Sequence, residues 1–264
     1  MRKVIMAVTF FSLVRFTIKF IKMKSIFLFL AVLSCVGNAK AQNVVYDDNV
    51  EVRQVTNFTS IEVSGAISLY LSQGSSVGVA VSAGDKKYNE KIKTEVKNGV
   101  LILSVDGGIW NGFNWADKKL KAYITVTELS KMDISGASVV NITSSLKANN
   151  LRMEISGASE VKGNINVEIL TMDISGASVA RLAGIAKEGN IEASGASNLS
   201  AYGLSLETCK ASTSGASTVK VTVNNQLTAE ASGASNIYYK GAAVTKILSC
   251  SGSSRVKNRS GNDD

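Results

Sequence analysis

The sequence contains no proline and no histidine, and its 264 residues include only three cysteines and two tryptophans. The absence of histidine excludes Ser-His and Cys-His nucleophilic catalysis and the usual zinc sites. The absence of proline is consistent with central β-strands, because a proline there removes a ladder hydrogen bond. No nucleophile elbow, Walker loop or dinucleotide fingerprint occurs in a suitable context. The commonest hydrolytic and nucleotide-dependent chemistries therefore have no motif in this chain.

The positive charge of the chain is concentrated at its start. The formal net charge is +8, but residues 1–41 hold seven of the 29 basic residues and none of the 21 acidic ones. The remainder carries 22 basic and 21 acidic residues, a net charge of +1. Because nucleic-acid binding depends on a basic surface, we expect no nucleic-acid partner.

The start of the chain resembles a targeting segment. Met23-Lys24 precedes the apolar run 25–33 and the Ala39-Lys40-Ala41 pattern, which predicts a signal peptide over 23–41 with cleavage before Gln42. We therefore expect an extracytoplasmic protein that is secreted, periplasmic or at the outer-membrane surface.

Two alternatives concern the first 35 residues. Residues 1–22 are interpreted as an upstream extension or a misassigned start, with Met23 as the true start; the alternative is a broken membrane anchor over 4–33. Cys35 ends a lipoprotein-like Val-Leu-Ser-Cys sequence, so a lipid anchor at this residue is a second route to a membrane.

One four-residue motif, Ser-Gly-Ala-Ser, occurs six times between residues 135 and 235, and imperfect copies start at Ser64 and Ser251. From Gly136 to Gly252 the motif glycines lie 18 to 21 residues apart. A catalytic motif normally occurs once per site, whereas a nearly constant period of this length is typical of solenoid repeats. We interpret the motif glycines as structural corners between stacked rungs of about 19 to 21 residues: Gly65, Gly136, Gly157, Gly176, Gly195, Gly215, Gly233 and Gly252.

The residues on both sides of each corner alternate between apolar and polar, as half-buried strands do. In one rung, for example, Met153 and Ile155 flank Glu154, and Val161 precedes Lys162. The sequence therefore predicts an all-β chain that coils as a parallel β-solenoid. A second corner half a period later is indicated at Asn149-Asn150, Lys162-Gly163-Asn164 and Glu188-Gly189-Asn190.

The front half lacks the short period but still alternates. It predicts strands over 60–63, 67–71, 77–81, 99–105 and 121–126, whereas 88–97 is compatible with a short helix or a strand. The resulting organisation is an N-terminal β-rich part of the solenoid over 42–130, a repetitive part over 131–257 and a polar tail over 258–264.

Both tryptophans lie in one polar, glycine-rich loop, residues 106–117. Trp110, Phe113 and Trp115 on such a loop are candidates for stacking on sugar rings or on a partner protein. The alternative is that they fold back as a lid over the open strands of the solenoid.

The position three residues before each corner glycine is often acidic. In-register rungs would stack these carboxylates roughly 4.8 Å apart, near the separation of a retaining glycosidase pair, and stacked carboxylates could also bind calcium. A column that recurs on several rungs is better explained as solvated surface, partly neutralised by Lys162, Arg181 and Lys220. The acidic column consists of Asp133, Glu154, Asp173 and Glu192.

After cleavage only two cysteines remain. Cys250 falls in an apolar column, where we expect a small core residue, and Cys209 lies about two rungs away. Because a disulfide needs Cα atoms within about 7 Å, we expect two free thiols.

The chain resembles a known family in three segments: the opening Phe58-Thr-Ser-Ile-Glu-Val-Ser-Gly65, the segment Tyr88–Leu103 and the serial Ser-Gly-Ala-Ser corners. Over about residues 44–257 it is similar to the putative auto-transporter adhesin, head GIN domain family of Bacteroidetes. The resemblance implies a right-handed β-helical fold similar to pectin lyases, no retained catalytic residues and a role in cell adhesion.

Three functions are compatible with these features. The first is a non-enzymatic extracytoplasmic adhesin that binds a glycan or a cell-surface protein and needs no cofactor. The second is a polysaccharide lyase or hydrolase that uses the acidic column. The third is a purely structural protein of the cell envelope, which would have neither ligand nor turnover.

Overall fold

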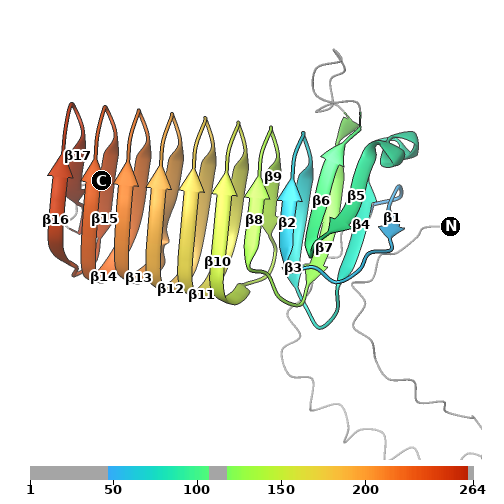
Figure 1. Ribbon diagram of the computed structural model, residues 1–264, viewed down its shortest axis with the longest axis horizontal. Helices are drawn as coiled ribbons and strands as arrows, with labels where there is room; N and C mark the ends of the chain where they lie inside the picture. The colour runs from blue at the N-terminus through green and yellow to red at the C-terminus, as the bar shows by residue number, and fades with distance from the viewer. Residues whose placement is uncertain (1–46, 107–117, 261–264) are drawn as a thin grey trace, which may run out of the picture. The chain divides into compact units, whose positions relative to one another are not determined.

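The computed structural model describes residues 47–106 and 118–260. Residues Asn49–Asp264 form one compact unit. The protein is all-β, with 64% strand and 3% helix, and is a β-solenoid of about seven turns. Figure 1 shows the rungs side by side along one axis. The prediction of a solenoid is confirmed.

The front of the solenoid contains short strands and one 3-10 helix. They are β1 (Glu51–Arg53), β2 (Ser60–Val63), β3 (Ser68–Gln73), β4 (Gly78–Ser82), η1 (Lys86–Lys91), β5 (Ile92–Lys97), β6 (Val100–Val105) and β7 (Lys121–Val126). All five strands predicted for this half are present. The segment left open between helix and strand contains both, because η1 ends where β5 begins.

The repetitive part contains the remaining strands. They are β8 (Lys131–Ile134), β9 (Val139–Ile142), β10 (Leu146–Ile155), β11 (Glu160–Ile174), β12 (Val179–Ala193), β13 (Asn198–Thr213), β14 (Thr218–Ala231), β15 (Asn236–Lys240), β16 (Val244–Cys250) and β17 (Arg255–Asn258). Each strand pairs in parallel with its equivalents one turn away.

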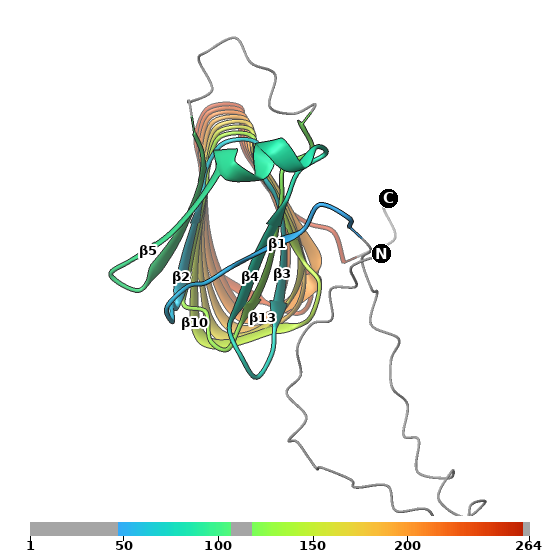
Figure 2. The same ribbon diagram turned by 90° about the vertical axis from the view of Figure 1, so that its right-hand side faces the viewer.

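Each rung has two facing walls that meet at the Gly-Ala corner, as the end-on view in Figure 2 shows. Wall A is formed by the strand segments before the corners, such as 131–134 and 152–155. Wall B is formed by the segments after the corners, such as 139–142 and 160–162. The two sets of segments form separate parallel ladders, which β2 and β3 extend toward the front.

Opposite the sharp corner, the strands curve without breaking. Burial stops alternating at pairs of consecutive exposed residues, namely Asn149-Asn150, Glu168-Ile169 and Lys187-Glu188. The parallel pairing with the next rung continues on both sides of these positions. The rounded lower edge of the rungs in Figure 2 corresponds to them. The second corner predicted at Asn149-Asn150 and at Glu188-Gly189-Asn190 is therefore a bend inside a continuous strand. The prediction at Lys162-Gly163-Asn164 is wrong, because the bend of that rung lies at Glu168-Ile169.

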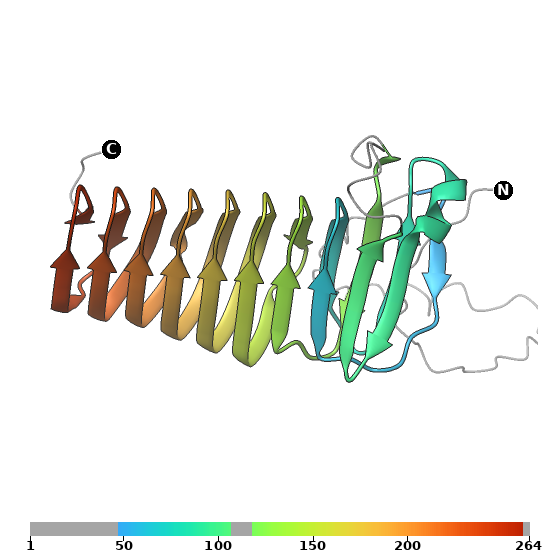
Figure 3. The same ribbon diagram turned by 45° about the horizontal axis from the view of Figure 1, so that its top comes forward.

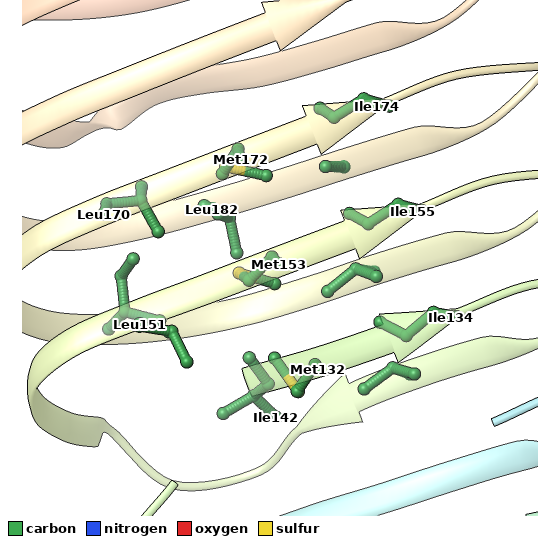
Figure 4. Close-up of a cluster of buried hydrophobic side chains, with 14 of the residues drawn as sticks. Met132, Ile134, Ile142, Leu151, Met153, Ile155, Leu170, Met172, Ile174 and Leu182 are labelled. Carbon is green, nitrogen blue, oxygen red and sulfur yellow. The ribbon is translucent and has the colours of Figure 1, made fainter. Parts of the chain in front are cut away.

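The core is a set of stacked columns between the walls. Met132, Met153 and Met172 occupy equivalent positions in three successive rungs, and each is at most 1% exposed. Figure 4 shows them stacked in line, with the isoleucines two residues later forming a second line. Each rung therefore buries its apolar side chains against the rungs on either side, and no rung has a core of its own.

The corner glycines are required by the approach of successive rungs. Gly157 has φ of +73°, and a Cβ there would lie 2.4 Å from the carbonyl oxygen of Gly136. The same carbonyl accepts a 2.8 Å hydrogen bond from the amide of Ala158. Equivalent bonds connect every motif corner to the one before it, so the corners form a continuous ladder. Only glycine fits because the left-handed backbone and the close contact coincide.

The last serine of each complete motif is buried, and in every copy except Ser159 its hydroxyl bonds to backbone carbonyls. Ser217 donates to the carbonyl of Ser214 at 2.8 Å or to that of Ala193 in the previous rung at 3.0 Å. Ser235 makes the equivalent contacts with Ser232 and Thr213. The motif therefore needs glycine for the backbone and serine for a buried hydroxyl that satisfies carbonyls where the chain reverses.

The front end of the stack differs from the rungs behind it. There β4 pairs antiparallel with β1 and β7, and β5 pairs antiparallel with β6. Val79 and Val81 of β4 and Ile92 of β5 are at most 3% exposed. Figure 3 shows η1 and the antiparallel strands at this end. The core is closed there by strands of a different orientation.

The two cysteines in the described part of the chain are free thiols, as expected. Cys209 is buried, which raises the pKa of its thiol to about 12. The expectation that Cys250 is a core residue is wrong, because Cys250 is exposed. Its column is buried in the other rungs, but β16 belongs to the last rung and no further strand in the described chain covers it.

Candidate functional site

The predicted acidic residues stack in register on the outer face of wall A. Strand pairing sets Asp133 beside Glu154, Glu154 beside Asp173, and Asp173 beside Glu192. The column continues to Glu62, which pairs with Asp133 through β2 and β8. Sequence reasoning missed Glu62, although it also lies three residues before a motif glycine.

The basic residues expected to neutralise this column lie elsewhere. Lys162, Arg181 and Lys220 follow the corners and therefore project from wall B, where Arg181 pairs with Glu160 at 2.5 Å. The cations that contact Glu154 come instead from wall A, at positions two residues before the acidic column. Lys131 and Arg152 contact Glu154 at 2.8 and 2.5 Å. The expectation that Lys162, Arg181 and Lys220 neutralise the column is therefore wrong, whereas Lys131 and Arg152 neutralise Glu154.

Neighbouring carboxyls in the column differ in acidity. Hydrogen bonds from Lys131 and Arg152 lower the pKa of Glu154 below its usual value. Partial burial raises the pKa of Asp133, and the negative charge of Glu154 adds to this effect. The folded chain therefore disfavours the charged form of Asp133 and favours that of Glu154.

The raised pKa of Asp133 predicts a pH-dependent effect of Asp133→Asn. The folded protein binds this proton more tightly than the unfolded chain, so the carboxyl costs stability as pH rises above its unfolded value. We expect Asp133→Asn to raise the melting temperature at pH 7 by a few degrees, and the difference from the wild-type protein to vanish near pH 3. Thermal unfolding followed by circular dichroism measures this. The control is Asp173→Asn, which removes an exposed carboxylate from the same column. A higher melting temperature of Asp133→Asn at both pH 7 and pH 3 would contradict the raised pKa of Asp133 as its cause.

A shallow groove of about 230 Å³ runs across wall A between the acidic column and the basic and polar column beside it. Side chains of both charges and several neutral hydrogen-bonding groups surround it. Its polar lining is Arg152, Thr171, Asp173, Asn190, Glu192, Lys210 and Ser212. The groove is smaller than the pockets that enclose small ligands, so a ligand would lie on it and remain partly exposed.

The predicted aromatic site lies outside the described residues, because Trp110, Phe113 and Trp115 belong to 107–117. The residues at the ends of this segment are held in place. Asp106 forms an ion pair with Lys93 at 2.8 Å, and its amide donates to the carbonyl of Lys91 at 2.8 Å. The carbonyl of Lys118 accepts from the amide of Gly84 at 2.8 Å.

The aromatic segment and the groove start from different rungs. The segment follows β6, and the groove begins at β10, which is separated from β6 by β2 and β8. Three strand spacings are roughly 14 Å. The structure therefore brings the acidic residues together but sets the groove three strands from the strand that leads into the aromatic loop.

The described residues were also compared with the requirements of metal and membrane binding. Within 47–106 and 118–260, no three acidic or cysteine side chains are grouped closely enough to hold a metal ion. No helix in the same residues is long and apolar enough to cross a membrane.

The sequence profile of the putative auto-transporter adhesin, head GIN domain family matches residues 57–243. The chain belongs to this family. The match is shorter at both ends than the resemblance over 44–257. A comparison with curated proteins finds no match. The family name favours a non-enzymatic protein at or outside the cell surface.

Solved structures share the head GIN fold. A putative adhesin from Bacteroides fragilis NCTC 9343 is 24% identical, with a TM-score of 0.74, and the match covers 79% of this chain and 95% of that one. A putative adhesin from Parabacteroides merdae ATCC 43184 is 17% identical with a TM-score of 0.64 and the same coverage. A putative lipid binding protein from Parabacteroides distasonis ATCC 8503, also with the same coverage, is 18% identical with a TM-score of 0.60. At these identities the likeness shows the fold alone.

Proposed function

We propose that this head GIN protein is a non-enzymatic extracytoplasmic adhesin that binds a glycan or another surface partner on wall A. The groove on wall A is the observation that carries the proposal. Its lining offers hydroxyl, amide, carboxylate and cationic groups on one open surface, which suits a ligand rich in hydroxyl groups. Its columns continue along the solenoid, so a chain-like ligand would lie parallel to the solenoid axis.

The aromatic loop is proposed as a second contact for the same ligand. Trp110, Phe113 and Trp115 would supply the stacking surfaces that the groove lacks. The loop follows β6, which continues the ladder of wall A. A polymer that extends from the groove by about three strand spacings would reach the base of the loop.

Binding to a glycan array, measured with the purified protein, tests the groove. Asn190→Trp puts a large side chain into the groove on an outward-facing strand position, and we expect it to reduce binding at least tenfold. Ser200→Trp makes a similar change on wall B and should leave binding unchanged. Equal binding by both variants and the wild-type protein would remove the groove from the proposal.

Trp110→Ala combined with Trp115→Ala tests the loop on the same array. We expect this variant to lose binding without any change in melting temperature. Retained binding would overturn the loop assignment and leave the groove as the sole contact.

A polysaccharide hydrolase or lyase is the second candidate, favoured by the opposite pKa shifts of Asp133 and Glu154. Against it, both oxygens of Glu154 already contact cations, and the groove does not enclose a substrate. Product release from the glycans that bind, abolished by Glu154→Gln or Asp173→Asn, would establish this alternative. If neither binding nor turnover were found, the third function, a structural envelope protein, would replace both.

A further inference from the structure

The last rung exposes side chains that every earlier rung buries. Leu248 occupies the same core column as Met153 and Met172, which are at most 1% exposed, yet Leu248 is 51% exposed. Cys250 follows two residues later and is also exposed, whereas Ile155 in its column is 1% exposed. The apolar interior of the solenoid is therefore open at this end of the described chain.

The backbone of the last rung is open as well. In the described residues, β16 pairs with β14 and β17 pairs with β15, and neither strand has a neighbour on its other side. Unpaired edges of this kind favour the addition of another strand. In the described residues the front end also has unpaired edges, at β1 and β5, but its core is covered, because Val79, Val81 and Ile92 are buried under antiparallel strands and η1.

We propose that the last rung is a docking surface for a second copy of this chain, joined tail to tail. The two ends of the described solenoid differ, and only the rear end exposes core columns, so head-to-tail addition would leave these columns without an apolar partner. Two rear ends brought together by a two-fold axis bury the same residues from both copies and close the assembly at two.

The charges select the axis of this dimer. β17 carries outward-facing Arg255 and Lys257, so pairing of β17 with its own copy would oppose like charges. β16 presents the uncharged Ser249 in its outward column. β16 and β17 run in opposite directions on the two walls (Figures 1 and 3). A two-fold axis parallel to the strands therefore pairs β16 antiparallel with the second copy's β17 and keeps corner over corner.

The chain's own last residues fit the open edges of β16 and β17 less well than a second copy does. The chain is still attached to wall B at Arg259, whose amide donates to the carbonyl of Tyr239 at 2.7 Å, and at Ser260, whose hydroxyl bonds to the carbonyl of Gly241 at 3.2 Å. Residues 261–264 alone reach about 14 Å when extended, which is too short to pair along both walls.

Sedimentation velocity over a range of concentrations tests the proposal with the purified chain. We expect a concentration-dependent dimer whose dissociation constant rises at least tenfold in Leu248→Lys. The matched control is Ile185→Lys, because Ile185 is an equally exposed apolar residue, 55% against 51%, on the side of the stack. This control should leave the dimer unchanged. A monomer at all concentrations, or equal effects of the two substitutions, would overturn the proposal.

The thiols provide a second, independent measurement. Cys250 should react with a maleimide when the protein is dilute and become protected as the dimer forms, while the buried Cys209 stays unreactive throughout. Protection of Cys250 in the monomer, lost when residues 261–264 are deleted, would show that the chain caps itself and would contradict the dimer. Neither measurement depends on glycan binding, so failure of the adhesin proposal is distinguished from failure of this one.

Discussion

Replacing Gly157 by alanine is expected to lower the free energy of unfolding by about 3 kcal/mol or more. The backbone at Gly157 is left-handed, which costs a residue with a Cβ roughly 1–2 kcal/mol. The new Cβ would also lie 2.4 Å from the carbonyl oxygen of Gly136, which is held by the corner hydrogen bond to Ala158. Urea unfolding followed by circular dichroism measures the loss.

Gly99 provides the control for this substitution. Its φ of +75° is almost the same as that of Gly157, but a Cβ added there meets no atom within 4 Å. Gly99→Ala should therefore show the backbone cost alone, about 1 kcal/mol. If the two substitutions cost the same, the close approach of successive corners is not what requires glycine at this position.

Met153→Ala is expected to cost about 2–5 kcal/mol, because it leaves a cavity in the middle of a fully buried column. The same truncation at the exposed end of the column, Leu248→Ala, should cost less than about 1 kcal/mol when the protein is dilute. Both values come from urea unfolding at a concentration that keeps the protein monomeric. Equal losses would indicate that the terminal rung is covered.

The repetitive fold was predictable because each rung repeats the same physical requirements. A motif glycine, apolar residues two and four positions earlier and an apolar residue four positions later define corner, wall A and wall B without any information from distant residues. The front end was not predictable in the same way. Val79 and Ile92 are covered by antiparallel strands and a 3-10 helix, and these contacts join segments that share no repeated pattern.

The candidate site was predictable in its stacking but not in its surroundings. A period of about 19 residues is enough to predict that Glu154 and Asp173 are neighbours. The period alone does not place Lys162, which lies eight residues after Glu154. The corner between these two residues reverses the chain, so Lys162 lies on the other wall. The prediction that Cys250 is buried was wrong for another reason. Its column predicts an inward side chain, but the core ends at that rung.

The ladder of corner hydrogen bonds also means that the length of the solenoid is set by its number of rungs. From Gly136 onward, each corner bonds to the corner directly before it, and all use the same Gly carbonyl and the same following amide. Duplication or deletion of one whole period would therefore join identical surfaces and change the length by one strand spacing, about 4.8 Å. The distance between the closed front end and the open rear end can thus lengthen or shorten in unit steps while the register of every remaining rung is preserved.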